Sequence, residues 1–186
     1  MTEPVRLTED LLPLLRLHPR ESWPSHPNLG DLSKFWLARH DWFRHADAEL
    51  AAATRAAIDR QVDPARFAPW LAQSLNRFLG ELEGHHAVED QHYFPVFRKL
   101  EARLGAGFDL LDGDHDTLHR AIEDIAAAGN AYLTALRADP LAASAALSRF
   151  GDVRERLGGG LIRHLGDEED LIIPIILDRG EDAIGG

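Results

Sequence analysis

The feature that most constrains the fold is the helical spacing of apolar residues from residue 31 almost to the end of the chain. Apolar side chains recur three and four residues apart there, β-branched residues are few, and no stretch alternates as strands do. Turn-forming sequences divide this part at Asp63-Pro64, Gly105-Ala106-Gly107 and Asp139-Pro140. The pattern predicts four long helices, which cover about residues 31–62, 64–104, 109–138 and 141–178.

Helices of about 30 residues, each ~45 Å long and joined by short connections, favour an all-α, up-down-up-down four-helix bundle. Pro95 and Pro174 could kink the second and fourth helices. The run Gly158-Gly159-Gly160 could split the fourth helix, or allow close approach of a neighbouring chain segment. We therefore expect one helical domain over residues 31–178, followed by a C-terminal tail over residues 179–186.

An N-terminal extension precedes this domain. Residues 1–28 contain five of the ten prolines, which excludes a single long helix. We expect an extension over residues 1–30 that packs along the body, with a short helix around Glu9–Leu17.

Composition excludes several functions. The formal charge of −11, from 20 Lys and Arg against 31 Asp and Glu, argues against partners such as nucleic acid or an anionic membrane. The lack of cysteine excludes disulfides, zinc–thiolate sites and cysteine nucleophiles. No apolar run approaches the ~20 residues of a membrane-spanning helix, and the first residues lack the layout of a signal peptide. The expected location is the cytoplasm.

Histidine and glutamate stand four residues apart in two of the predicted helices. His85 with Glu89, and His164 with Glu168, fall on the apolar faces of the second and fourth helices. A buried carboxylate needs a partner, because burying an unpaired charge is costly. One such pair alone would favour a hydrogen-bonded core pair, whereas its repetition favours metal binding.

The other two helices add histidines to the predicted interior. His115 and His119 are four residues apart and align with the apolar face of the third helix, and His40 lies at the edge of that of the first. His45 falls on the polar side of its helix. The candidate metal ligands are therefore His40, His85, Glu89, His115, His119, His164 and Glu168.

Seven ligands are too many for one ion and suit two ions bridged by both carboxylates. Imidazole with carboxylate suits iron, and also manganese or zinc, but not calcium or magnesium. Three neighbours of these ligands fall outside the set because they lie about 100° from the centre of the apolar face: we expect His86 and Asp90 to be half exposed and Glu169 to be solvated. His92 faces inward by its spacing and could be an eighth ligand or a hydrogen-bonding partner of one.

These motifs together resemble the hemerythrin family, specifically the bacterial hemerythrin-like HHE cation-binding domains, over about residues 31–178. The matching segments are Ala38–Arg44, His85–Asp90 followed by Tyr93-Phe94-Pro95, Asp114–His119, and His164–Glu169 followed by Pro174. The resemblance implies a four-helix bundle and a non-heme di-iron centre, held by the same seven residues and in some members bridged by an oxo or hydroxo group. Members of the family bind or sense dioxygen, or handle iron, nitric oxide or peroxide.

Several functions remain open at this point. The first is binding or sensing of a small molecule such as dioxygen or nitric oxide, for which an unidentified protein partner would supply the output. The second is a di-iron enzyme that degrades peroxide or oxidises iron, and a third is iron storage or repair. The Glu-x-x-His spacing of ferritin-like enzymes occurs only once, at Glu89–His92, which favours the first function.

Overall fold

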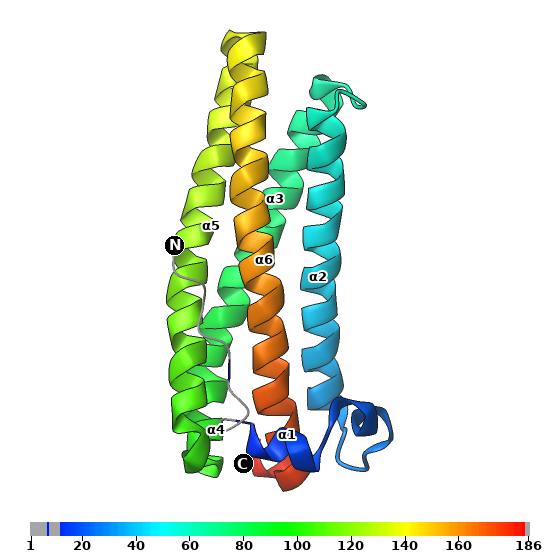
Figure 1. Ribbon diagram of the computed structural model, residues 1–186, viewed down its shortest axis with the longest axis vertical. Helices are drawn as coiled ribbons and strands as arrows, with labels where there is room; N and C mark the ends of the chain where they lie inside the picture. Colours follow the sequence, from blue (N-terminus) through cyan, green and yellow to red (C-terminus); the bar gives the residue numbers. More distant parts are fainter. Residues whose placement is uncertain (1–6, 8–11, 185–186) are drawn as a thin grey trace. The chain divides into compact units, whose positions relative to one another are not determined.

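The computed structural model describes residue 7 and residues 12–184, and the regular secondary structure of this part of the chain is all helical, without a β-strand (Figure 1). The all-α prediction is thus confirmed for the described residues. The helices are α1 (Pro13–Leu17), α2 (Asp31–Ile58), α3 (Pro64–Val88), α4 (Phe94–Leu100), α5 (Gly105–Ala138) and α6 (Pro140–Arg179). Short 3-10 segments cover Arg20–Ser25, Ala102–Leu104 and Glu181–Ala183, and a π-helix covers Glu89–Tyr93.

The predicted first long helix is too long at its C-terminal end. Helix α2 ends at Ile58 rather than Val62, because Arg60 adopts a left-handed backbone with φ 57°. The N–H of Gln61 then donates to the carbonyl of Ala56 (2.8 Å), and the N–H of Arg60 donates to that of Ala57 (3.1 Å). These two hydrogen bonds form a Schellman cap, which closes the helix.

The predicted single helix over residues 64–104 is wrong. The π-helix interrupts it after Val88, and α4 ends where Glu101 leaves the helical region, with φ −136° and ψ 69°. Pro95 lies in the first turn of α4, where backbone N–H groups have no partner within the helix, so its missing N–H costs no helical hydrogen bond. Gly105 is helical (φ −50°, ψ −44°), so α5 begins there and not at Asp109.

Helix α6 is unbroken at its glycines and at Pro174, so neither predicted interruption occurs. A Cβ atom on Gly158 would lie 2.5–2.9 Å from the carboxylate of Asp47. This carboxylate pairs with Arg154 of α6 at 2.9 Å. The missing side chain of Gly158 therefore leaves space for the ion pair between Asp47 and Arg154. At the N-terminal side, α1 occupies part of the predicted helix, and Glu9–Leu11 lie outside the described residues.

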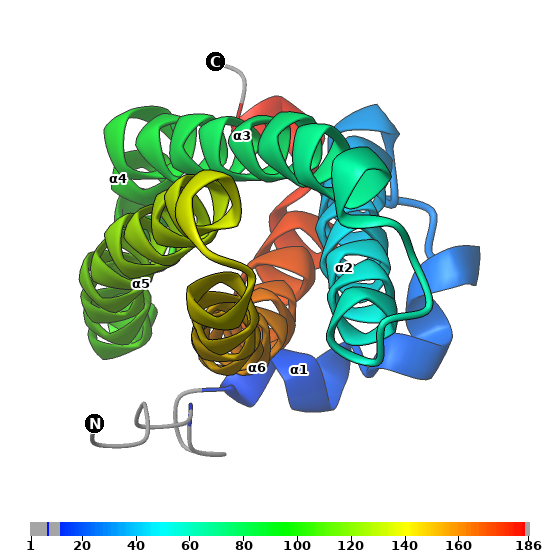
Figure 2. The same cartoon turned by 90° about the horizontal axis from the view of Figure 1, so that it is seen from above.

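The chain forms two compact units, and α2, α3, α5 and α6 each contribute residues to both. The first unit comprises Met1–Trp42, His85–Asp116 and Ile162–Gly186, and the second comprises Phe43–Gly84 and Thr117–Leu161. In the second unit, buried side chains such as Phe43, Phe78 and Phe150 come from α2, α3 and α6, three of the helices that Figure 2 shows end-on.

The N-terminal segment is part of the core of the first unit. Leu14 of α1 and Trp23 are buried with the apolar residues near the C-terminal end of α6, which α1 adjoins in Figure 1. Asn28 donates to the carbonyl of Leu177 (2.7 Å). Glu181 accepts hydrogen bonds from the first N–H groups of α2, which fixes the start of that helix.

Candidate metal centre

Seven side chains of the first unit converge in two groups. In each group, the potential ligand atoms lie within 4.8 Å of one another. The first group is His40, His85, Glu89 and Glu168, and the second is His86, His115 and His164.

Four helices and the π-helix supply these side chains. The four-residue spacing acts as the sequence predicted: His85 Nε2 lies 3.0 Å from Glu89 Oε1, and His164 Nε2 lies 3.6 Å from Glu168 Oε2. Glu89 is the first residue of the π-helix. Single π turns often occur at functional sites, because the extra residue redirects side chains.

Within each group, imidazole nitrogens face each other. His40 Nε2 lies 3.2 Å from His85 Nε2, and His115 Nε2 lies 3.1 Å from His164 Nε2. Two nitrogens bonded to one ion at about 2.1 Å and at a right angle would be about 3 Å apart. The spacing of both pairs is therefore that of two ligands of one cation.

The two glutamates lie between the groups. Glu89 presents Oε1 to the first group and Oε2 to the second, since Oε2 is 3.6 Å from His115 Nε2. Glu168 Oε2 lies 3.4 Å from His40 Nε2, and the same atom approaches His164. Both carboxylates are thus placed to be shared by two cations.

These carboxylates are poorly satisfied without a cation. Both oxygens of Glu89 and Oε2 of Glu168 are buried, and none accepts a hydrogen bond from a described residue. A buried acceptor in this state is costly, and a cation would remove the cost. The donor set, imidazole with carboxylate, fits iron, manganese or zinc.

Burial also controls the protonation of these groups. It lowers the pKa of His85 to about 3 and that of His164 to about 4, which keeps both rings neutral and able to bind a metal. It raises the pKa of Glu89 to about 8. Burial, reinforced by the negative charge of Glu89, raises the pKa of Glu168 well above its usual value. Burial alone thus favours the protonated, neutral carboxyl groups, whereas a nearby cation favours the charged carboxylates.

His86 was predicted to be half exposed, and this is wrong: its side chain is 0% exposed. Its ring stacks on His115, with centroids 4.1 Å apart, while the His85 ring lies 5.2 Å from that of His40. Helix α3 thus has a neighbour on each side, α2 and α5. Two positions about 100° apart on α3 therefore both face the interior. The sequence signal that could have indicated the burial of His86 was its position directly after His85.

The structure does not bring His119 into either group, and its side chain is exposed. The buried face of α5 continues from His115 to Leu118 and Ile122, so the fourth residue after His115 falls outside it. His92, expected to face inward, is also exposed, because the π-helix shifts the helical phase after Glu89.

Glu169 was predicted to be solvated, and this too is wrong. It is 2% exposed, and its Oε1 lies 3.0 Å from His40 Nδ1. Its Oε2 accepts a hydrogen bond from Arg20 at 2.9 Å. The N-terminal segment that carries Arg20 covers this side of α6. Its contribution could not be read from the helical phase of α6 alone.

Other hydrogen bonds orient the candidate ligands. Asp90 Oδ1 lies 2.7 Å from His115 Nδ1, and the indole N–H of Trp36 donates to Glu168 Oε1 at 3.0 Å. Such partners fix ring orientation and raise the basicity of a ligating histidine. Asp90 itself is partly exposed, as expected, and reaches His115 of α5.

An all-helical unit in which histidines and carboxylates of several helices meet defines a helical metal-binding protein. Residues 31–176 match the family described as hemerythrin HHE cation binding domain, and the chain belongs to this family. The resemblance expected from the sequence is thereby confirmed, and with it a cation-binding role for the domain. Comparisons with curated proteins and with solved structures found no match. No helix in the described part of the chain is long and apolar enough to cross a membrane.

Proposed function

We propose that this chain holds two iron ions and uses them to bind or sense a small molecule, dioxygen or nitric oxide. The observation that carries the proposal is the position of Glu89, which presents one carboxylate oxygen to each group of ligands. One carboxylate shared in this way suits a pair of ions better than a single ion. Glu168, close to a histidine of each group, supports the same assignment.

The proposed ligand set differs from the sequence prediction at one residue, since His86 replaces His119. One ion would be held by His40 and His85, the other by His86, His115 and His164, and both by Glu89 and Glu168. The first ion would have fewer protein ligands, which leaves room there for a small molecule. Bound iron would supply reversible oxidation and ligand exchange.

The surroundings favour a small, apolar ligand. The ring of Trp36 lies 6.3 Å from that of His40, and Phe94 stacks on His115 at 5.3 Å. Leu165 is fully buried next to His164. Side chains of this kind exclude water and tolerate a diatomic molecule better than a polar organic substrate. We therefore favour binding or sensing over turnover by a peroxide-degrading or iron-oxidising enzyme.

We further propose that α2, α3, α5 and α6 form the up-down four-helix bundle over residues 31–178, with the extension packed on it. Short connections support this arrangement: residues 59–63 join α2 to α3, and Asp139 alone separates α5 from α6. Connections of this length place consecutive helices side by side and antiparallel.

Metal content of protein from iron-replete cells tests the ligand set. The wild type should contain about two irons per chain. His86→Ala should lose at least one of them, whereas the matched variant His119→Ala should keep both, with circular dichroism to confirm that both variants fold. A wild type with one iron, or with zinc throughout, would exclude the di-iron assignment. Loss of iron in His119→Ala but not in His86→Ala would support the ligand set predicted from the sequence, with His119 in place of His86.

Absorption spectra of the reduced, iron-loaded protein test the function. The spectrum is recorded under nitrogen, after exposure to air or nitric oxide, and again after argon purging. A change that argon reverses supports reversible binding, and a stable oxidised product excludes carriage of dioxygen but agrees with redox sensing. Sustained consumption of peroxide or ferrous iron, lost in His164→Ala, would instead identify an enzyme.

A further inference from the structure

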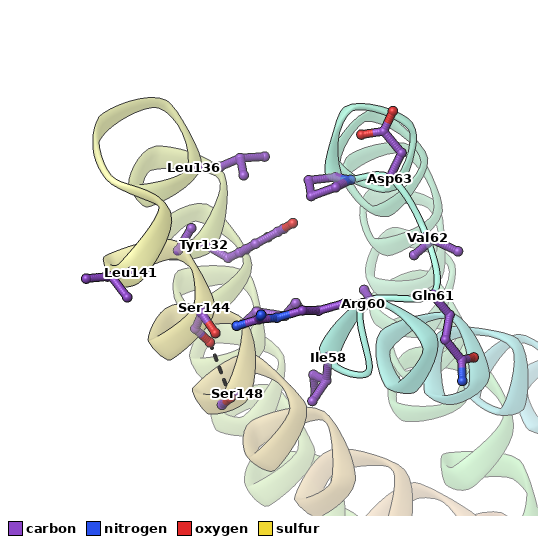
Figure 3. Close-up of a pocket in the computed structure, with 14 residues that line it drawn as sticks. Ile58, Arg60, Gln61, Val62, Asp63, Tyr132, Leu136, Leu141, Ser144 and Ser148 are labelled. Carbon is purple, nitrogen blue, oxygen red and sulfur yellow. Dashed lines mark hydrogen bonds between the residues drawn. The ribbon is translucent and has the colours of Figure 1, made fainter.

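A cavity of about 650 Å³ lies within the second unit, formed by residues of all four helices of that unit and of the connection after α2 (Figure 3). A volume of this size is typical of small-molecule sites. None of the candidate metal ligands lines it. Three large apolar residues at this cavity are exposed: Ile58 (37%), Val62 (39%) and Leu141 (81%). An apolar wall open to solvent is a feature of binding sites.

Arg60, on the wall of this cavity, occupies a position that normally favours glycine. It is the C′ residue of the Schellman cap of α2, and the only non-glycine residue of the described chain with positive φ. Residues with a side chain are strained there, and glycine is usual. A backbone outlier of this kind is a starting point for a functional hypothesis about the side chain that it carries.

The side chain of Arg60 extends across the cavity towards Ser144 of α6 (Figure 3). It is the only basic residue on the wall. The acidic residue on the wall, Asp63, accepts a hydrogen bond from the N–H of Ala65 (2.9 Å), and Figure 3 shows its carboxylate directed away from the guanidinium group. The guanidinium group is therefore available to an anion.

Tyr132 supplies a second polar group. The residue as a whole is 2% exposed, and it lines the cavity. Figure 3 shows the hydroxyl directed across the cavity. From this position the hydroxyl can donate a hydrogen bond to a ligand in the cavity.

We propose that this cavity binds a small amphipathic carboxylate, whose apolar body lies against the aliphatic side chains and whose anionic head meets Arg60 and Tyr132. Guanidinium groups pair with carboxylates through two parallel hydrogen bonds, which gives both affinity and orientation. Because all lining residues belong to the second unit, this site does not depend on the metal centre.

Isothermal titration of the full chain with decanoate tests the proposal. We expect saturable binding to the wild type at one site per chain. Arg60→Gly should weaken this binding about tenfold or more, by loss of a charge-assisted hydrogen bond. The same variant should melt at the same temperature or higher, because glycine suits the left-handed position. Tyr132→Phe should weaken binding by a smaller factor.

Two controls separate this site from general effects of charge or hydrophobicity. Arg137→Ala removes an exposed arginine of α5 that does not line the cavity, and should bind decanoate as the wild type does. 1-Decanol, which has the same chain without the anionic head, should bind more weakly than decanoate. No binding by the wild type, equal affinity of wild type and Arg60→Gly, or equal affinity for decanol would overturn the proposal. Iron content should not change in any of these variants.

Discussion

Arg20 connects the N-terminal segment to a proposed metal ligand, His40, through a single carboxylate. Its Nε donates to Asp170 (2.6 Å), one terminal nitrogen donates to Glu169 (2.9 Å) and the other to the carbonyl of Gly166 (2.9 Å). Glu169 in turn contacts His40. A residue 20 positions before the nearest proposed ligand thus acts on that ligand's orientation.

Replacement of Arg20 by alanine should therefore affect both stability and metal binding. It leaves Glu169 buried without its cationic partner, at a cost of about 1–3 kcal/mol. Denaturant unfolding should show this loss, and the iron-loaded protein should release iron to a chelator faster than the wild type. Arg20→Lys, which keeps the charge but not the three-way hydrogen bonding, should fall between the two. Chelation rates equal to wild type in both variants would show that Arg20 is only structural.

The glycines of α6 offer a matched pair for a second test at this scale. A Cβ on Gly158 would meet the carboxylate of Asp47, whereas a Cβ on Gly160 would lie 3.7 Å from Leu118, an ordinary contact. Gly158→Ala should destabilise the protein by roughly 1–3 kcal/mol through overpacking. Gly160→Ala should be neutral, or stabilising by up to about 1 kcal/mol, because alanine favours helix. Thermal melts compare the two, and equal effects would contradict the assigned role of Gly158.

Side-chain positions were predictable where spacing along one helix decides them. His85 with Glu89, and His164 with Glu168, come together because residues four apart share a face. The burial of His86 and Glu169 could not be predicted in this way. It depends on which neighbouring segments cover α3 and α6, and a single helix carries no information on that.

At the scale of elements, helix ends with local caps were predictable, and so was a disturbance of the second helix near Pro95, but the form of that disturbance was not. Asp63 and Asp139 cap the helices that follow them, as their sequences indicate. The π-helix at Glu89–Tyr93 ends two residues before Pro95, where a kink was expected, but nothing in the sequence specified a π-helix. Pro95 has no N–H to donate, and its ring would clash with the carbonyl of Gln91 in a regular α-helix, which favours the wider turn before it.

Glu101, at the end of α4, links this end to α6 by charged hydrogen bonds whose contribution to stability should depend on pH. It accepts hydrogen bonds from Arg103 and from Arg179 at the end of α6, both at 2.7 Å. The hydrogen bond from Arg103, aided by Arg179, lowers the pKa of Glu101 from 4.5 to about 2. A lowered pKa in the folded state stabilises the protein fully above the unfolded value, and this stabilisation is lost as pH falls towards the folded one.

Glu101→Gln should therefore be less stable than the wild type at pH 7, by about 1 kcal/mol because the arginines are partly exposed. This difference should shrink as pH falls from about 4.5 to about 2, the range between the two pKa values. Urea unfolding at several pH values measures it. A difference that does not change with pH would show that Glu101 acts by packing and not by charge.

For the whole molecule, metal binding and folding should be coupled. The proposed ligands come from four helices and the π-helix, so the unfolded chain does not present them together. A metal that binds only the folded state stabilises it, by about 2.7 kcal/mol at a free concentration one hundred times the Kd. The metal-free protein should melt at a lower temperature than the iron-loaded protein in calorimetry. Equal melting temperatures at neutral pH would contradict the coupling.

The division into two units was not predictable from the sequence, because every long helix reads as one continuous periodic segment. The periodicity of α2 shows no break at Phe43, where the first unit gives way to the second. Which stretches of a long helix cluster together depends on contacts between segments far apart in the chain. Local spacing therefore predicted the helices but not how their residues group.

The first unit is assembled from three separate stretches of chain, and this has a consequence for biosynthesis. His40 and His85 leave the ribosome early, but His164 and Glu168 belong to the last stretch to be translated. A nascent chain that ends before Glu168 has no complete set of ligands for either ion. On the proposed ligand set, the metal centre is therefore completed only after translation has passed Glu168, and a product truncated before this residue would lack a full set of ligands.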